Sequence, residues 1–162
     1  MFNFKIENYF KLIFIVSLIT IISALYIEHI LGHQPCNLCL LQRIPYGLSI
    51  ILIVFNHLVN KYENFIVILL ALIFVFSLMI SAYHFGIESG FFQESIVCKL
   101  RSISEILTKE QLLEQLSEKT VSCKDVTFRI LGFSLTAINI IISLILLIIL
   151  YKIFTNYEKF KN

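Results

Sequence analysis

Four long runs without a charged residue constrain the fold of this sequence more than any other feature. They contain 16, 17, 24 and 22 residues and lie between Lys11 and Glu28, Arg43 and Lys61, Glu63 and Glu88, and Arg129 and Lys152. A helix crosses the hydrocarbon core of a bilayer with ~20 mostly apolar residues. None of the runs alternates as a membrane β-strand does. We therefore predict an all-α membrane protein, a bundle of four transmembrane helices.

The composition agrees with a membrane location. Apolar residues make up 58% of the chain and charged residues 15%, whereas soluble domains have about 25% charged residues. Too little polar surface is available to cover a water-soluble particle, which argues against a soluble enzyme or a disordered chain. The net charge of +2 is too small and too scattered to predict a nucleic-acid partner. The expected surroundings are membrane lipid.

We expect the whole chain, 1–162, to form a single integral membrane domain. The predicted spans cover about 12–31, 44–60, 65–84 and 130–151, and the predicted outer loops cover about 32–43 and 85–129. No small-x-small cleavage pattern precedes Gly32, so the first run is predicted to be a retained span and not a signal peptide.

The longer outer loop carries its own local signals. Ser102-x-x-Glu105 and Thr108-x-x-Gln111 each match a capping box, which predicts two short amphipathic helices. Such helices either lie flat on the membrane or pack into a small core of the loop. The sequence leaves both arrangements open.

The distribution of basic residues predicts the orientation. Six lysines lie in short segments beside the spans, on the side that also holds both termini. The other side has seven basic residues, but five of them lie within residues 88–125 of the long loop, which the positive-inside bias weighs lightly. The termini are therefore predicted to be cytoplasmic. All four cysteines, Cys36, Cys39, Cys98 and Cys123, then lie on the opposite side, in a compartment where disulfides persist.

The spacing of the cysteines favours redox chemistry, although four cysteines permit three pairings. A structural disulfide between Cys98 and Cys123 could stabilise the fold by ~3.5 kcal/mol, but the small Cys36–Cys39 ring by only ~2 kcal/mol. A C-x-x-C pair is better explained as a reactive dithiol. A zinc site made only of cysteines is disfavoured, because the second pair is 25 positions apart. Leu40 after Cys39 excludes a c-type haem, so no metal is predicted.

Two further residues have both a chemical and an ordinary interpretation. Arg43, near the start of the second span with Cys39, favours a thiolate or simply anchors lipid headgroups. His84 closes the third span and either carries protons for a membrane-dissolved electron acceptor or directs its polar edge to water. Three further histidines are predicted to lie at the membrane interface, namely His29, His33 and His57. Asn139, midway along the fourth span, is predicted to bridge helices.

Together, these motifs resemble the disulfide bond formation protein B (DsbB) family. The resemblance rests on four spans, on Cys-x-Leu-Cys-x-x-Gln-Arg-x-Pro-Tyr from Cys36 to Tyr46, on Tyr-His-x-Gly-x-Glu from Tyr83 to Glu88, and on the separated cysteine pair that follows. It covers the chain from about Ile22 to the last span. The combination is far more specific than a C-x-x-C alone.

The resemblance implies a quinone-linked protein-disulfide oxidoreductase of the bacterial inner membrane, acting as a monomer. It would reoxidise a periplasmic thioredoxin-fold oxidase similar to DsbA. By resemblance, Cys98 forms the mixed disulfide with that partner, Cys123 attacks Cys36, and the liberated Cys39 thiolate passes electrons to ubiquinone or menaquinone. Arg43 would then polarise the quinone, and His84 would lie near the same pocket.

Two alternatives remain at this stage. A quinone reductase of the vitamin K epoxide reductase type also combines a C-x-x-C with a second pair, but its loop cysteines precede the C-x-x-C, whereas here they follow it. The other alternative is a non-catalytic four-helix membrane scaffold or small transporter with structural disulfides. Mixing reduced partner with quinone distinguishes these, because a scaffold leaves the quinone spectrum unchanged.

Overall fold

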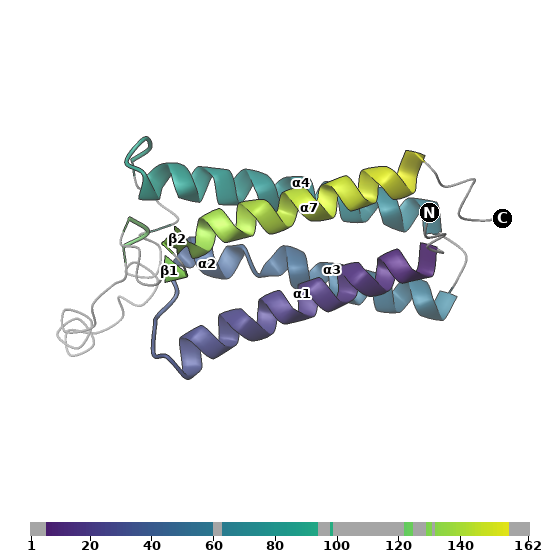
Figure 1. Ribbon diagram of the computed structural model, residues 1–162, viewed down its shortest axis with the longest axis horizontal. Helices are drawn as coiled ribbons and strands as arrows, with labels where there is room; N and C mark the ends of the chain where they lie inside the picture. Colours follow the sequence, from purple (N-terminus) through teal and green to yellow (C-terminus); the bar gives the residue numbers. More distant parts are fainter. Residues whose placement is uncertain are drawn as a thin grey trace, which may run out of the picture.

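Four long helices form a bundle in the computed structural model, which describes residues 6–59, 63–93, 98, 122–124, 129–130 and 132–155. The helices are α1 (Ile6–His29), α3 (Ile44–Val59), α4 (Glu63–Glu88) and α7 (Leu135–Thr155) (Figure 1). A short helix, α2 (Asn37–Leu41), leads into α3, and the two together form one of four segments long and apolar enough to cross a membrane. The prediction of an all-α membrane bundle is confirmed.

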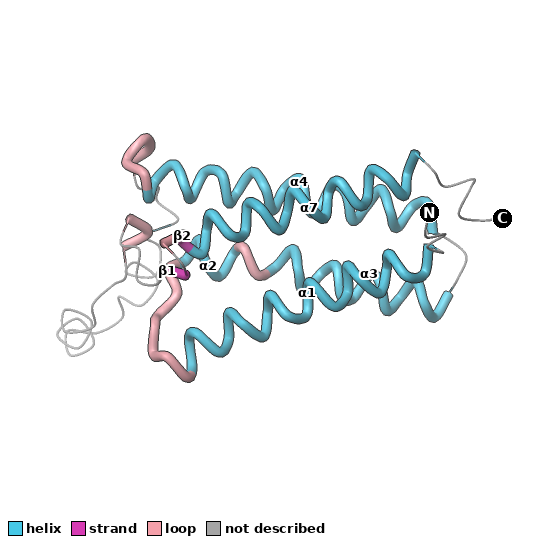
Figure 2. The backbone as a smooth tube through the Cα atoms, in the orientation of Figure 1, coloured by secondary structure: helices cyan, strands magenta, loops and turns pink. Residues whose placement is uncertain are grey.

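Several helix ends differ from the predicted span ends. Helix α1 begins at Ile6, before the predicted start at about residue 12, and α7 ends at Thr155, after the predicted end at about residue 151. Helix α4 continues one turn beyond residue 84 and ends at Glu88, so His84 lies inside the helix. Helix α7 begins only at Leu135, because an antiparallel hairpin of β1 (Arg129–Ile130) and β2 (Phe133–Ser134) precedes it (Figure 2). Gly132, with φ +86°, lies in the hairpin turn, where a left-handed backbone favours glycine. The two predicted amphipathic helices lie outside the described residues.

Apolar side chains cover both the inside and the outside of the bundle. Phe74, Leu70 and Leu146 are fully buried in the central cluster. On the outer faces Ile51 and Ile148 are each 65% exposed. Because lipid tails are as apolar as a protein core, such an exterior is expected for helices in a bilayer.

Small polar side chains hold the helices together inside the bundle. The Asn139 amide of α7 donates to the Ser81 hydroxyl of α4 at 2.6 Å, and the Tyr46 hydroxyl of α3 donates to Asn139 Oδ1. The hydroxyls of Ser77 and Ser143 lie 3.1 Å apart across the same two helices. Small residues allow close helix approach, and buried polar groups need partners. Asn139 therefore bridges helices, as its position in the sequence predicts.

The two ends of the bundle are built differently. The start of α1 and the end of α7 lie at one end, whereas α2, β1 and β2 lie at the other, where α1 diverges from α7 (Figure 1). At this second end, α4 stops at a left-handed Gly90, and the Phe91 N–H donates to the Gly86 carbonyl at 2.8 Å. Such an arrangement closes a helix C-terminus. The chain thereby turns back over the end of α4, where the Phe92 N–H also donates to the Gly86 carbonyl at 3.2 Å.

Candidate active site

Cys36 is the N-cap residue of α2, and its sulfur caps that helix. Its backbone is extended, with φ −71° and ψ 166°, and Sγ accepts a hydrogen bond from the Cys39 N–H at 3.2 Å. An N-cap side chain commonly accepts from the N–H three residues later. The C-x-x-C spacing supplies this contact directly, because Cys39 occupies that third position. Only 6% of Cys36 is exposed.

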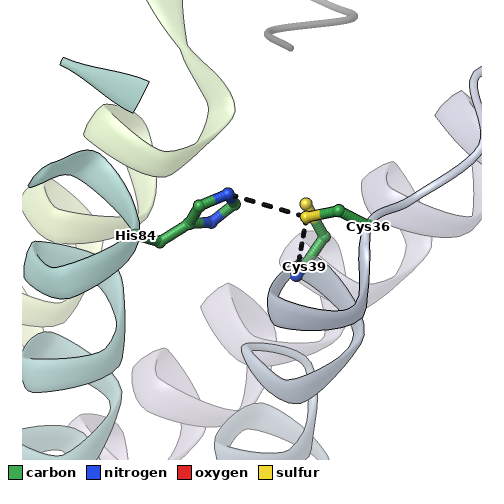
Figure 3. Close-up of side chains that lie close together, drawn as sticks. All are labelled: Cys36, Cys39 and His84. Atoms are coloured by element: carbon green, nitrogen blue, oxygen red, sulfur yellow. Dashed lines mark hydrogen bonds between the residues drawn. The ribbon is translucent and has the colours of Figure 1, made fainter. Parts of the chain in front are cut away.

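His84 approaches the same sulfur from α4. Its Nε2 lies 3.6 Å from Cys36 Sγ, although the two residues are 48 positions apart in the sequence (Figure 3). The ring is 2% exposed. The sulfurs of Cys36 and Cys39 and a ring nitrogen of His84 all lie within 4.8 Å of one another. The dithiol and the imidazole therefore form one buried cluster.

Polar contacts fix the orientation of the His84 ring. The Gln42 amide nitrogen lies 3.1 Å from Nδ1, and the Thr136 hydroxyl lies 3.2 Å from the same atom. Thr136 donates to Glu88 Oε1 at 2.6 Å. When the Gln42 amide donates to Nδ1, the proton of a neutral ring lies on Nε2 and is directed at Cys36. The other carboxylate oxygen, Glu88 Oε2, is buried without a hydrogen-bond partner in the described part of the chain.

These contacts favour the charged form of Cys36. The pKa of the Cys36 thiol is lowered to about 5, chiefly because the Cys39 thiol hydrogen bonds to its sulfur. Burial opposes the lowering of this pKa, while the His84 ring and the Cys39 backbone N–H add to it. Near neutral pH the reduced pair therefore carries a thiolate on Cys36, and the thiolate is the reactive form of cysteine. The role that the resemblance implies for Cys39, as the thiolate that passes electrons onward, stays a prediction.

The second cysteine pair lies against the first. Cys98 and Cys123 form a disulfide, while Cys36 and Cys39 are free thiols. Cys123 and Cys36 belong to one buried cluster with Leu38, and Cys98 and Cys39 pack against it. Cys123 is 2% exposed, whereas Cys98 is only half-buried. All four sulfur-bearing residues therefore meet at one end of the bundle.

Arg43 makes its charged contact with α1 instead of with a cysteine. Its Nη1 lies 2.5 Å from Glu28 Oε2, and Nη2 donates to the Ala24 carbonyl at 3.5 Å. Both partners of the ion pair are about three-quarters buried. The ion pair joins α1 to α3 where α1 diverges from α7.

A cavity of about 270 Å³ opens beside Cys39 and Arg43, between α1, the chain before α2, the start of α3, and α7. Its walls are mostly apolar, and Ile19, Ile138 and Ile142 are among the residues that line it. The volume is near the lower end of the range for small-molecule sites, ~300–1,000 Å³. The dithiol therefore has two different neighbours, His84 on Cys36 and this cavity on Cys39.

The structure does not bring every proposed site residue to the same place. Arg43 lines the cavity together with Cys39, but His84 is not among its lining residues. His84 approaches the cavity through Gln42 and Thr136, which contact its ring and also line the cavity. The roles of Arg43 and His84 toward a quinone remain predictions.

The sequence does not predict four polar neighbours of the site. Gln42 and Glu88 stand within the quoted motifs without a predicted role, and Glu28 marks only the end of an uncharged run. Thr136 gives no signal in the sequence, since a threonine in an apolar helix is ordinary. Only packing shows that Thr136 meets His84 and Glu88.

A bundle of membrane-spanning helices that presents a C-x-x-C dithiol beside a second cysteine pair defines a class, the membrane thiol–disulfide proteins. Comparison with known families places the chain more narrowly within this class. The sequence matches the family "Disulfide bond formation protein DsbB" over residues 7–153, and the chain belongs to this family. It is a multi-pass membrane protein of disulfide bond formation.

Two relatives are similar to the chain over most of its length, and the name of one of them agrees with this family. The chain is 25% identical to the Disulfide bond formation protein B of Acinetobacter baumannii (strain ATCC 17978), over 93% of this chain and 92% of the relative. It is 28% identical to an uncharacterized protein of Rickettsia prowazekii (strain Madrid E), over 83% of this chain and 80% of that protein. No solved structure matches the chain.

Proposed function

We propose that the protein is a quinone-dependent thiol–disulfide oxidoreductase that reoxidises a periplasmic, DsbA-like thioredoxin-fold oxidase. Electrons pass from the partner to Cys98 and Cys123, then to Cys36 and Cys39, and finally to membrane quinone. The observation that carries the proposal is the order of exposure. Cys98 is half-buried, Cys123 and Cys36 share a buried cluster, and Cys39 lines the cavity.

The first exchange takes place at the more accessible sulfur. A thiolate of the reduced partner attacks Cys98 Sγ, the Cys98–Cys123 bond breaks, and Cys123 leaves as a thiolate. Attack at Cys98 is favoured because Cys123 is almost completely covered. The product is a mixed disulfide between Cys98 and the partner.

The second exchange moves the electrons inward. The Cys123 thiolate attacks Cys36 of an oxidised Cys36–Cys39 pair, and Cys39 is released as a thiolate. The second thiolate of the partner then resolves the mixed disulfide, and the freed Cys98 thiolate attacks the Cys36–Cys123 bond and restores Cys98–Cys123. The partner leaves oxidised, and Cys36 and Cys39 hold two electrons. The free Cys36–Cys39 thiols beside an intact Cys98–Cys123 disulfide correspond to this product.

His84 holds a proton where the exchange needs one. When Cys36 is released, its sulfur becomes negative, and the Nε2–H at 3.6 Å can donate to it. The contacts of Gln42 and Thr136 with Nδ1 keep the ring in this orientation. We assign His84 the stabilisation of the Cys36 thiolate, and Thr136 and Gln42 the positioning of the ring.

The cavity has the chemistry that a quinone head group requires, either ubiquinone or menaquinone. Its apolar walls suit a ring and an isoprenoid tail, and it contains one cysteine and one guanidinium, Cys39 and Arg43. A bound quinone supplies an acceptor for two electrons and two protons. Arg43 would hold a carbonyl oxygen of this group, and Glu28 keeps the guanidinium in position.

The proposed location is the bacterial inner membrane, with both termini in the cytoplasm and the cysteines in the periplasm. Two observations support it. The start of α1 and the end of α7 lie at the bundle end opposite α2 (Figure 1), and lysines concentrate in the short segments of that end. The chain would act as a monomer in the lipid and quinone pool.

One assay tests the proposal. Purified protein is mixed with a reduced DsbA-like oxidase and a short-chain quinone, and the quinone absorbance is followed together with the partner's thiols. We expect one quinone reduced for each partner disulfide formed, and no reaction when the protein is omitted. An unchanged quinone spectrum would instead identify a non-catalytic scaffold or transporter.

A further inference from the structure

Three ligand atoms for a soft divalent cation lie together at the dithiol. We propose that the reduced protein binds one Zn²⁺ through Cys36 Sγ, Cys39 Sγ and His84 Nε2. Zinc favours thiolate sulfur and imidazole nitrogen, and these are the groups that meet here. The proposal goes beyond the thiol exchange chemistry, because binding needs neither quinone nor partner.

The geometry is close to that of a zinc site. The three ligand atoms lie within 4.8 Å of one another, and Cys36 Sγ and His84 Nε2 are 3.6 Å apart. With Zn–S bonds of about 2.3 Å, ligand atoms around a tetrahedral zinc are separated by about 3.8 Å. Rotation of the cysteine side chains by about 1 Å at the sulfur closes the site.

The surroundings of His84 are those of a metal-bound imidazole. When Nε2 binds the metal, the ring proton moves to Nδ1, where it can be donated to the Thr136 hydroxyl oxygen at 3.2 Å, since Thr136 gives its own proton to Glu88. Contacts of this kind orient a ligating histidine and strengthen metal binding. Burial of Cys36 and His84, at 6% and 2% exposure, excludes competing water.

Glu88 is the candidate for the fourth ligand. Its Oε1 lies 3.8 Å from His84 Nε2, and Oε2 is buried without a hydrogen-bond partner in the described residues. An unpartnered buried carboxylate oxygen is costly, and coordination of a cation removes that cost. Glu88 does not belong to the group of atoms within 4.8 Å of one another, so its side chain would have to turn toward the sulfurs to become the fourth ligand.

The site exists only in the reduced protein. Binding releases the remaining thiol protons and makes two Zn–S bonds, with no change in oxidation state. When Cys36 and Cys39 form a disulfide, neither sulfur is a thiolate, and the cation loses two of its ligands. Zinc thus stabilises the dithiol against reoxidation. The sequence predicts no metal, because the second cysteine pair is 25 positions apart, and it does not show that His84, 45 positions beyond Cys39, meets the C-x-x-C pair.

Cobalt provides a spectroscopic test, because Co²⁺ in a thiolate site has intense charge-transfer absorption. The full-length Cys98→Ser/Cys123→Ser protein, which contains only the C-x-x-C thiols, is reduced without oxygen and titrated with Co²⁺. We expect one tetrahedral, thiolate-bound Co²⁺ per chain that is displaced by Zn²⁺. The same protein with its Cys36–Cys39 disulfide intact should give no such spectrum. Equal spectra in both states, or none in the reduced state, would overturn the proposal.

Two variants and a control assign the ligands. His84→Ala removes one protein ligand and should weaken binding by about 100-fold or more, while Glu88→Gln should weaken it by about 10-fold. His57→Ala, a change of the same kind at an exposed residue in the last turn of α3, should leave the affinity unchanged. An affinity that is insensitive to both His84→Ala and Glu88→Gln would overturn the assignment. The comparison of oxidised and reduced protein stands without any ligand variant, should one of them fail to fold.

Discussion

The two sides of the Cys36–Cys39 pair offer opposite surroundings to the same chemistry. On the Cys36 side, His84, Gln42 and Thr136 form a buried polar network that stabilises a negative sulfur. On the Cys39 side lies a mostly apolar cavity with Arg43 at its wall. The difference shows how a dithiol can serve two reactants. The polar side controls the charge of the pair, and the cavity side controls which molecule reaches it.

Removal of either sulfur should have the largest effect, because the polar side and the cavity side both act on the Cys36–Cys39 pair. Cys36→Ser or Cys39→Ser should reduce oxidation of the partner to the uncatalysed rate, because no disulfide can form between the two positions. The measurement is the loss of partner thiols over time in the quinone assay. Leu40→Ser, which changes the exposed residue of α2 that directly follows Cys39, should retain most of the activity. Full turnover in the cysteine variants would contradict the mechanism.

Loss of Arg43 should affect the cavity side alone. Arg43→Ala is expected to raise the apparent KM for quinone about 10-fold, which corresponds to about 1.4 kcal/mol, while kcat changes less. The physical reason is the loss of the guanidinium that would hold the quinone oxygen. Steady-state kinetics with a short-chain quinone measure both constants. An unchanged KM would show that Arg43 serves only to join α3 to α1 through Glu28.

Loss of His84 should affect the polar side alone. In reduced Cys98→Ser/Cys123→Ser protein, the ultraviolet absorbance of the thiolate should titrate with the lowered pKa of Cys36, at about 5. His84→Gln replaces the imidazole by a neutral amide, so the thiolate loses the electrostatic attraction of the ring, and this titration should move upward by about 1 pH unit. His57→Gln is the matched control and should leave it in place. A midpoint that does not respond to His84→Gln would disprove the assigned role.

The same pKa has a consequence for stability. Folding lowers the pKa of the Cys36 thiol. Ionisation of this thiol therefore stabilises the folded, reduced protein, and the stabilisation is complete at pH values above the pKa of the thiol in the unfolded chain. This contribution is lost as the pH falls toward about 5. The oxidised protein has no such titration. We therefore expect the melting temperature of the reduced form to fall relative to the oxidised form as the pH decreases from 9 to about 5.

The smallest expected effect concerns the ion pair by which Glu28 holds the Arg43 guanidinium in position. Glu28→Gln should change the quinone KM by less than about 5-fold, because a partly exposed ion pair contributes up to about 1 kcal/mol. The Glu28–Arg43 pair should also behave as one unit, so that Glu28→Gln has no further effect in the Arg43→Ala background. Kinetics of the two single variants and the double variant test this. Additive effects would mean that Glu28 acts independently of Arg43.

Much of the fold could be predicted because the membrane imposes a simple rule. Uncharged runs of membrane-spanning length must become helices, and all four did. The ends of the helices were harder to predict. Residues 85–88 extend α4 because Gly90 closes the helix only there. Helix α7 begins later than predicted because the β1–β2 hairpin precedes it. The sequence does not reveal this, since residues 130–134 are all apolar or small and resemble the start of a span.

The sequence by itself determined the membrane class, the number of long helices, the family and the identity of the four cysteines, because length, charge and motif spacing are local properties. The tertiary structure decided which sulfur caps α2 and meets His84, which one lines the cavity, and that Glu28, Glu88 and Thr136 take part. These facts depend on contacts between helices that are far apart in the chain. Distance and burial, which spacing in the sequence does not specify, set the charge of a thiol and the neighbours it can react with.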